Sequence, residues 1–325
     1  MNTQTCAAAL QAEVEKIIIG KSDQIHNILL SVFCGGHVLL DDLPGSGKTT
    51  LIRTLSIALG CDHKRIQFTP DLLPSDILGM NIYDQKTGDF VLRKGPINTN
   101  VLLADEINRA IPRTQSALLE AMEEQQVTIE GQSFRLPQPF LVMATQNPVE
   151  RESTFQLPAA QMDRFFMKLS LGYPSQTEEM DMLSRLGDGI PYDKVKAVTT
   201  PEELVALREQ IRQVTISPAL TQYIVDLVQA TRRSPLLRAG ASPRASRSLF
   251  QGAKASAAMA GRDYAIPEDV QALAVPILSH RIVLTGEARY AHKTPEEIID
   301  QILKETPASP TPRQWIERNH EKQNQ

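Results

Sequence analysis

Short apolar runs alternate with helical patterns through the first half of the chain. Continuous apolar runs separated by helices are typical of a parallel sheet that is covered on both faces. The pattern therefore predicts an α/β core whose strands are joined by helices such as Lys48–Leu59 and Pro112–Glu124. The predicted strands are His37–Asp41, Arg65–Phe68, Asn100–Ala104, Phe140–Thr145 and Phe165–Leu169.

Two segments interrupt this alternation. Asn81–Arg93 has short β-prone arms around Thr87 and Gly88, and Gln126–Leu136 alternates apolar and polar residues around Gly131. Arms of this kind around a glycine turn predict β-hairpins near residues 81–93 and 126–136. Neither segment fits a buried sheet, so we expect both hairpins to project from it.

After Tyr173 and Pro174 the pattern predicts helices alone, several with proline in the first turn, where its missing N–H is tolerated. We therefore expect the α/β core over residues 1–173 and an all-α second domain over residues 174–304. Residues 305–325 contain three prolines and then polar residues, which predicts a flexible tail. The predicted helices of the second domain are Thr177–Leu186, Pro201–Gln213, Pro218–Thr231, Pro243–Ala260 and Pro267–Leu278.

Composition narrows the class of protein. A chain of 325 residues with 42% hydrophobic and 22% charged residues is typical of a soluble globular protein with two domains. A net charge of −4 argues against bulk neutralisation of nucleic-acid phosphates. Cys6, Cys34 and Cys61 show no metal or redox spacing, which indicates reduced thiols in a cytoplasmic protein. No apolar run reaches the ~20 residues that span a bilayer.

The segment Leu43–Thr50 (LPGSGKTT) carries the first chemical signal, because it follows a predicted strand and begins a predicted helix. Gly45 and Gly47 lack Cβ atoms, so backbone N–H groups can surround phosphates. Lys48 can reach the β and γ oxygens, and the Thr49 hydroxyl can hold Mg²⁺. The segment therefore predicts a nucleoside triphosphate site. Its candidate binding residues are Pro44, Gly45, Ser46, Gly47, Lys48, Thr49 and Thr50.

Polar residues at the ends of two later strands add to this site. Asp105 and Glu106 end the apolar run Val101–Glu106 (VLLADE), at the strand end where open α/β sheets place ligands. Asp105 can hold the Mg²⁺ shell, and Glu106 can orient and polarise the attacking water. Asn147 follows another predicted strand, and its amide can bond the γ-phosphate and the water. Asn147 followed by Pro148 is also typical of a turn, so the functional reading depends on the other motifs.

Two arginines are further candidates. Arg164 lies at the start of the fifth predicted strand and offers a permanent charge with several donors suited to phosphate. The alternative for Arg164 is a surface ion pair with the neighbouring Asp163. Arg244 begins a helix of the second domain and could reach the nucleotide when the domains close, or it could be a solvated helix residue.

Taken in order, these segments resemble the MoxR group of AAA+ ATPases from about Val14 to Arg281. The resemblance implies an AAA+ P-loop core with a five-stranded parallel sheet, two hairpin inserts and an all-α lid. Asp42 replaces the first glycine of the usual P-loop pattern, a change found readily among MoxR relatives. The matching segments include Gly36–Thr49, Pro74–Gly79, Asp105–Met122, Gln126–Gly131, Met143–Pro148, Leu157–Phe165 and Gly240–Ala245.

The resemblance also implies roles for single residues. It identifies Asn147 as sensor one, Arg164 as the arginine finger that acts on the ATP of a neighbouring subunit, and Arg244 as sensor two. Ile19 and Gly20 are similar to the segment that lines the adenine pocket. By the same resemblance Lys48 and Thr49 are the Walker A residues, and Asp105 and Glu106 the Walker B residues.

For the whole protein, the resemblance implies an ATPase that forms a ring, which we expect to be hexameric, and that uses ATP and Mg²⁺. Family members are taken to act as chaperone-like remodellers of protein clients, with partners that carry von Willebrand factor A domains. They serve metal or cofactor insertion and complex maturation.

Two alternatives remain open for the activity. A nucleic-acid motor is disfavoured by the acidic balance and by the acidic or neutral tip Glu130–Ser133 of the second hairpin. A magnesium-chelatase motor subunit would share the architecture. A scaffold without activity is disfavoured because every catalytic position is filled.

Overall fold

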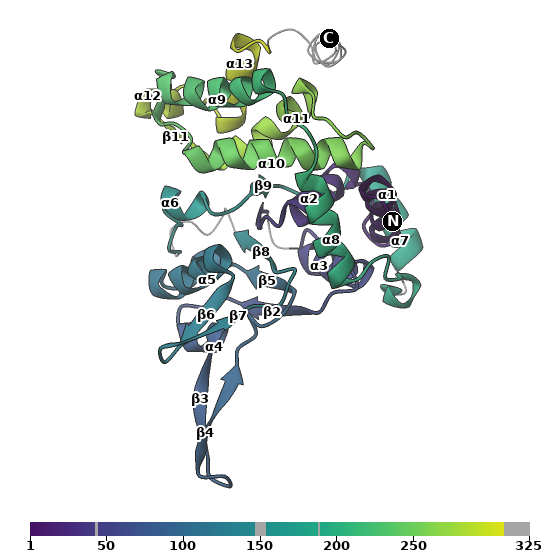
Figure 1. The fold of residues 1–325 in the computed structure, drawn as a ribbon, viewed down its shortest axis with the longest axis vertical. Coiled ribbons are helices and arrows are strands. Elements are labelled where there is room, and N and C mark those ends of the chain that lie inside the picture. The colour runs from purple at the N-terminus through teal and green to yellow at the C-terminus, as the bar shows by residue number, and fades with distance from the viewer. Residues whose placement is uncertain (43–44, 147–153, 188, 309–325) are drawn as a thin grey trace, which may run out of the picture.

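The centre of the molecule is a five-stranded sheet in the order β2-β5-β8-β1-β9 (Figure 1). It is seen in a computed structural model that describes residues 1–42, 45–146, 154–187 and 189–308. Every neighbouring pair of strands is parallel, which confirms the predicted sheet. The strands are β1 (Val38–Asp41), β2 (His63–Gln67), β5 (Val101–Asp105), β8 (Leu141–Gln146) and β9 (Met167–Leu169).

Successive residues of the central strands serve two separate apolar clusters, because side chains alternate across a strand. In β1, Val38 and Leu40 belong to one buried cluster and Leu39 belongs to the other. Strands β5 and β8 divide in the same way. Both faces of the sheet are therefore covered, which explains why these strands are apolar throughout rather than at every second position.

Different helices cover the two faces. The cluster that contains Val38 also takes in side chains of α1 (Thr3–Glu15), α2 (Ser22–Cys34) and α3 (Lys48–Ala58). The cluster that contains Leu39 takes in side chains of α4 (Pro74–Leu78) and α5 (Pro112–Glu124). Two short elements complete this half, the 3-10 turn η1 (Ile107–Arg109) and α6 (Ala159–Met162).

Both predicted hairpins form two-stranded antiparallel sheets outside the central sheet. The first, β3 (Gly79–Asp84) with β4 (Asp89–Lys94), projects far from the body of the molecule (Figure 1). The second, β6 (Gln126–Ile129) with β7 (Gln132–Arg135), was also expected to project, and this expectation was wrong for its apolar face. Val127 and Ile129 are buried in the cluster that covers α5, because alternation places both side chains on one face of β6.

The second half is a helical lid, as predicted, with one addition. An antiparallel pair of very short strands, β10 (Leu237–Ala239) and β11 (Val283–Leu284), joins the helices. These strands are too short for alternation to show in the sequence. In the described part of the chain, no helix has the length and apolar character needed to cross a bilayer. The helices are α7 (Gln176–Leu186), α8 (Pro201–Arg212), α9 (Pro218–Arg233), α10 (Pro243–Met259), α11 (Pro267–Leu278), α12 (Gly286–Tyr290) and α13 (Pro295–Glu305), with 3-10 turns η3 (Tyr192–Lys194) and η4 (Ser279–Arg281).

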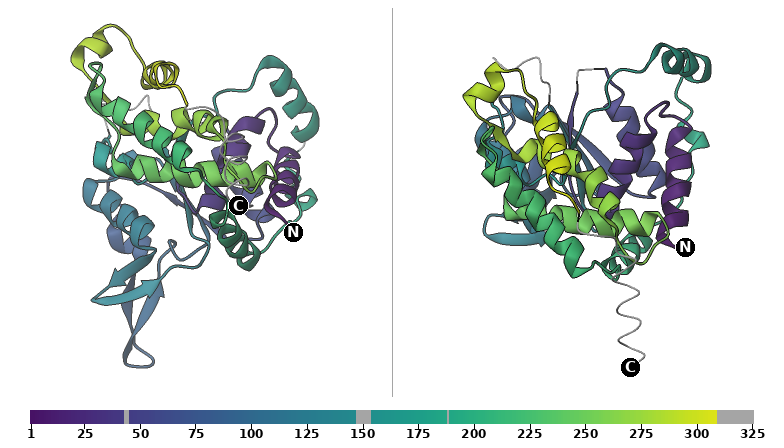
Figure 2. Two further views of the ribbon diagram at one scale, coloured as in Figure 1. Left: turned by 45° about the horizontal axis from the view of Figure 1, so that its top comes forward. Right: turned by 90° about the horizontal axis from the view of Figure 1, so that it is seen from above.

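A single apolar cluster extends from the sheet into the lid. It includes buried side chains of α1 and α2 together with those of α8, α9, α10 and α11. Figure 2 shows α10, in green, running toward the N-terminal helices in purple, and α10 contacts both α1 and α2. The division into domains at residue 173 remains a prediction, because this cluster lies on both sides of it.

Candidate functional site

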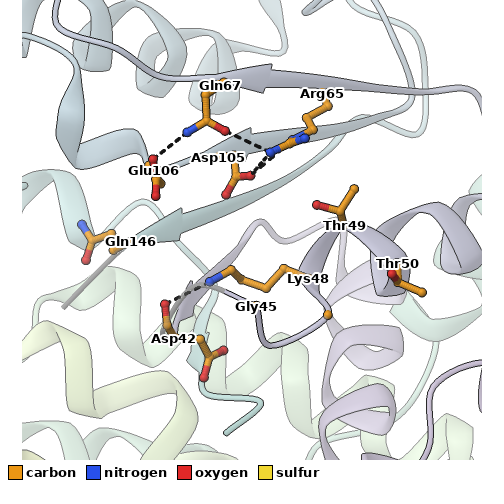
Figure 3. A pocket seen from close by; sticks show the side chains of 11 residues that line it. Asp42, Gly45, Lys48, Thr49, Thr50, Arg65, Gln67, Asp105, Glu106 and Gln146 are labelled. Atoms are coloured by element: carbon orange, nitrogen blue, oxygen red, sulfur yellow. Dashed lines mark hydrogen bonds and ion pairs between the residues drawn. The ribbon is translucent and has the colours of Figure 1, made fainter. Parts of the chain in front are cut away.

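A cavity of about 370 Å³ opens at the carboxyl ends of the central strands (Figure 3). It brings the predicted phosphate loop and the predicted acidic pair together, although they lie far apart in the sequence. The register of the parallel sheet causes this meeting, since β1, β5 and β8 end at the same edge. The cavity is lined by Asp42, Gly45, Gly47, Lys48, Thr49, Thr50, Arg65, Gln67, Asp105, Glu106 and Gln146.

The phosphate loop has the backbone shape that the sequence predicted. Gly45 and Gly47 have φ of 84° and 81°, in the left-handed region that favours glycine. A Cβ at either position would meet no other atom within 4 Å, so the backbone conformation and not crowding requires glycine. Helix α3 begins at Lys48, and its first residues line the cavity, which suits binding of an anion at a helix N-terminus. Pro44 lies outside the described residues.

Asp42 has a structural role that the sequence did not reveal. Its buried carboxylate accepts hydrogen bonds from the backbone N–H groups of Leu171 (2.8 Å) and Gly172 (3.0 Å) and from the Ser170 hydroxyl (2.7 Å). Its backbone oxygen accepts a hydrogen bond from Lys48 Nζ at 2.9 Å. The residue that replaces the first glycine therefore ties the start of the phosphate loop to the segment after β9.

Asp105 ends β5 with both carboxylate oxygens engaged. Oδ1 accepts a hydrogen bond from the buried Thr145 hydroxyl at 2.6 Å. Oδ2 accepts two from Arg65, at 2.7 Å from Nη2 and 3.2 Å from Nε. This network fixes the orientation of Asp105 toward the cavity, where Figure 3 shows it across from Lys48 and Thr49.

Glu106 is held by a second set of contacts. Its Oε2 accepts a hydrogen bond from Gln67 Nε2 at 2.6 Å and lies 3.2 Å from Arg109 Nη1. Its backbone N–H donates to Thr145 Oγ1 at 2.8 Å. With φ of 56°, Glu106 adopts a left-handed conformation that is uncommon for a residue with a Cβ and that clusters at functional sites. The turn after β5 thus aims the carboxylate into the cavity.

Arg65 and Gln67 are cavity residues that the sequence reasoning missed. Both lie on β2, an edge strand of the sheet. In this strand only Ile66 is apolar and buried, and the other residues are polar and exposed. The polar residues of β2 are the signal in the sequence that indicates them. Gln146 was also missed. The predicted residue Asn147, which follows Gln146, lies outside the described residues.

The oxygen donors of the cavity fit Mg²⁺ carried by a triphosphate. The Thr49 hydroxyl and the Asp105 carboxylate line the same cavity. Mg²⁺ usually keeps several waters and takes one or two carboxylates together with phosphate oxygens. Among the described residues, no group of three or more His, Cys, Asp or Glu side chains that could hold a metal occurs.

A second, more apolar cavity of about 550 Å³ adjoins the phosphate loop. Its lining combines Ile17, Ile18 and Ile19 with residues of α7 and with Ser46 of the loop, and an apolar slot of this kind suits a flat base. Gly20 is not among its described lining residues. Gly20 has φ of 71°, a left-handed conformation that favours glycine, and the Glu178 carboxyl group of α7 lies beside it.

Arg164 and Arg244 lie together, on the same glutamate. Arg164 Nε is 3.1 Å from Glu123 Oε2, and Arg244 pairs with Oε1 of the same side chain. We call these three residues the arginine cluster. It joins α5, the segment before β9 and the start of α10. Arg164 therefore forms its ion pair with Glu123 and not with the neighbouring Asp163. Neither arginine is among the described residues that line the two cavities.

Comparison with known proteins accords with this geometry. Residues 37–167 match the ATPase family associated with various cellular activities (AAA), and residues 229–302 match the AAA lid domain. The chain is 47% identical to the protein YeaC of Bacillus subtilis, over 89% of this chain and 91% of that one. It is 43% identical to the chaperone MoxR1 of Mycobacterium tuberculosis, over 90% and 79% of the two chains.

A solved structure agrees at the level of the whole fold. The crystal structure of a candidate ATPase from Cytophaga hutchinsonii superposes with a TM-score of 0.88 and 41% sequence identity, over 95% of this chain and 96% of that one. The fold of nearly the whole chain is therefore shared with that protein. The chain belongs to the MoxR family of AAA+ ATPases.

Proposed function

We propose that this protein converts ATP and water into ADP and phosphate at the described cavity, with Mg²⁺ as cofactor. The observation that carries the proposal is that one cavity gathers Lys48, Thr49, Asp105 and Glu106. These are the cation, hydroxyl and carboxylates that phosphoryl transfer to water requires. The adjoining apolar cavity, which Ile19 lines, supports adenine as the base.

Each residue of the cavity has a separate task in this proposal. Lys48 and the N–H groups at the start of α3 bind the β- and γ-phosphates. Glu106, held by Gln67 and Arg109, orients the attacking water and acts as the general base that accepts its proton. Thr49 and Asp105 would hold Mg²⁺, which neutralises charge on the phosphate oxygens. We assign Asn147 the task of bonding the γ-phosphate and the water.

We further propose that the active form is a ring, expected to be hexameric, with each ATP between two subunits. The sequence suggested that Arg244 reaches the nucleotide when the domains of its own subunit close. Because Arg244 lies beside Arg164 on Glu123, we propose instead that both arginines of one subunit act on the triphosphate of the neighbour. Support comes from their shared contact with Glu123 and from their absence among the described lining residues of their own cavities. A planar guanidinium that reaches a neighbour's phosphates adds charge stabilisation in the transition state.

The work done by hydrolysis is proposed to be remodelling of a protein client, with a partner that carries a von Willebrand factor A domain, in metal or cofactor insertion or complex maturation. One similar protein is named a chaperone. The projecting β3–β4 hairpin is evidence for a protein client, because the side chains of Phe90 and Tyr83 near its tip are 72% and 54% exposed. Their rings are in edge-to-face contact, with 5.5 Å between the ring centroids. Exposed aromatic residues on a projecting arm suit apolar segments of another chain.

The test mixes two inactive variants. A Glu106→Gln subunit keeps its arginines but lacks the residue that orients water, and an Arg164→Ala subunit keeps its cavity but lacks the arginine. If the site lies between subunits, the mixture recovers ATPase activity that neither variant shows alone. No recovery under conditions in which subunits exchange would contradict a shared site. Strong, salt-dependent stimulation by DNA would instead favour the nucleic-acid motor.

A further inference from the structure

A second network of polar groups lies beneath the arginine cluster, with Asp163 at its centre. Asp163 directly precedes Arg164, and its Oδ2 accepts a hydrogen bond from the Ser242 hydroxyl at 2.7 Å. Ser242 is the N-cap of α10, and its Oγ accepts a hydrogen bond from the Arg244 backbone N–H at 3.1 Å. One carboxylate therefore connects the two segments that carry the two arginines.

The other side of Asp163 faces a buried cation from the lid. Arg281 Nη1 is 3.5 Å from Asp163 Oδ1, and the Arg281 side chain is only 2% exposed. Arg281 Nη2 also donates to the Phe165 carbonyl at 2.7 Å and to the Ser248 hydroxyl at 3.1 Å. Arg281 of the lid thus contacts the segment that carries Arg164 at two points, the backbone carbonyl of Phe165 and the carboxylate of Asp163.

The contact between Arg281 Nη1 and Asp163 Oδ1 is a buried ion pair without a hydrogen bond. Desolvation lowers the pKa of Arg281 to about 10, while the Asp163 carboxylate acts in the opposite direction. A buried charge that loses its partner is strongly destabilising, so the guanidinium restricts the positions that Asp163 can take. Phe165, which follows Arg164, is itself fully buried in the apolar cluster beside α5. The segment is consequently held on both sides of Arg164.

We propose that Asp163 is a positioning residue that holds Arg164 and Arg244 as one unit, so that the lid of a subunit sets the arginine geometry offered to its neighbour. This inference rests on the proposed action of Arg164 on the adjacent subunit. Asp163 is not among the described residues that line the cavity, and it would act through Arg164 and, by way of Ser242, through Arg244. Displacement of a catalytic group by about 1 Å reduces rates by on the order of 100-fold, so such a support has a measurable effect.

The experiment places one substitution in either half of the mixed assembly. The donor subunit carries Glu106→Gln and supplies arginines, and the receiver subunit carries Arg164→Ala and supplies the working cavity. Asp163→Asn in the donor should lower kcat by on the order of 10- to 100-fold with the KM for ATP unchanged. The same substitution in the receiver, whose Arg164 is already removed, should change kcat by less than about twofold.

Glu209→Ala is the matched control, since it removes a carboxylate from an ion pair with Arg212 that is exposed on the surface. It should leave the mixture unaffected in either subunit. An equal loss of kcat from Asp163→Asn in donor and receiver would show general destabilisation and overturn the proposal. If the mixture with Asp163 intact shows no recovery, the shared site itself has failed, and the inference fails with it for a recognisably different reason.

A measurement that needs no ATPase activity tests the network directly. Melting temperatures of Asp163→Asn, Arg281→Met and the double variant form a double-mutant cycle. If Asp163 and Arg281 are coupled, the double variant should lose clearly less than the sum of the two single losses. Strictly additive losses would mean that the lid does not hold the Arg164 segment through Asp163, and the proposal would be overturned whatever the activity.

Discussion

The nucleotide cavity and the arginine cluster are built from charge in opposite ways. In the cavity, Asp105 and Glu106 face Lys48, and strand ends and one loop supply the residues. In the arginine cluster, a helix of the core supplies Glu123. The two cations that share it come from a connecting segment and from a helix of the lid. Sheet register fixes the first arrangement, whereas packing of the lid against the core fixes the second. A movement of the lid would thus alter the arginine cluster and leave the cavity walls in place.

The largest expected effect is on kcat, and it comes from a substitution in the arginine cluster. Arg164→Ala should lower kcat by about 10³- to 10⁵-fold, because a trans-acting arginine stabilises charge only in the transition state. The affinity for ATP, measured by equilibrium binding, should stay unchanged. Arg185→Ala, at an exposed pair with Asp181, is the control and should have no effect on either quantity. A matching loss of affinity would mean that Arg164 serves its own cavity.

Within the cavity, Glu106→Gln should lower kcat by about 10²- to 10⁴-fold while ATP still binds. Glutamine keeps the shape of the side chain but cannot draw a proton from water. The comparison variant is Lys48→Ala, which should lose ATP binding itself because a charged contact to the phosphates disappears. Single-turnover hydrolysis and nucleotide binding measured on both variants test this. If both variants lost ATP binding, or if both kept it, Glu106 and Lys48 would not have the separate tasks proposed for them.

His37, which hydrogen-bonds β8 and the end of α5, should make stability depend on pH. Its Nδ1 accepts from the Val142 N–H at 3.0 Å, and its Nε2 bonds the carbonyl of Met122, next to Glu123, at 3.1 Å. Burial lowers the pKa of His37 from 6.5 to about 4, and nearby Arg208 acts in the same direction. The unfolded chain therefore takes up the proton first as the pH falls.

The stabilisation from neutral His37 should be complete above pH 6.5 and should be lost progressively toward pH 4. The loss amounts to at most about 3 kcal/mol of the free energy of unfolding. Urea denaturation at several pH values measures it, and His37→Gln should flatten the slope in this window. Burial also lowers the pKa of His280, to about 3, so part of the slope should persist in the variant. A free energy of unfolding that is flat from pH 6.5 to 4 would contradict the neutral, buried state.

The smallest expected effect concerns Glu123. Its pairs with Arg164 and Arg244 are partly exposed, and such pairs contribute about 1 kcal/mol or less. Both arginines must leave this pair to reach a neighbour's phosphates. Glu123→Gln should therefore raise kcat by up to about fivefold, with the affinity for ATP unchanged. A decrease in kcat would instead make Glu123 a support of the arginines, like Asp163.

The main residues of the cavity could be predicted from the sequence because they lie in short local motifs. The residues that depend on contacts between distant segments could not. The phosphate loop and the acidic pair each carry their chemistry within a few consecutive residues. Apolar runs marked four strands of the central sheet, and the mixed run Arg65–Phe68 marked β2. Arg65 and Gln67 acquire a function only because β2 lies beside β5. The hydrogen bonds of Asp42 depend on a segment more than a hundred positions away. Nothing in the sequence near Glu123 indicates that two arginines meet on it.

Helix α1 lies ahead of residue 37, where the match to the ATPase family begins. It nevertheless contacts α2, α3 and α10, and its Leu10 and Val14 are fully buried. A chain shortened to the matched region would lose α1 and would expose apolar side chains of α2, α3 and α10 that it covers. Boundaries for any truncated version of the protein should accordingly follow the buried interior and include the first turn of the molecule.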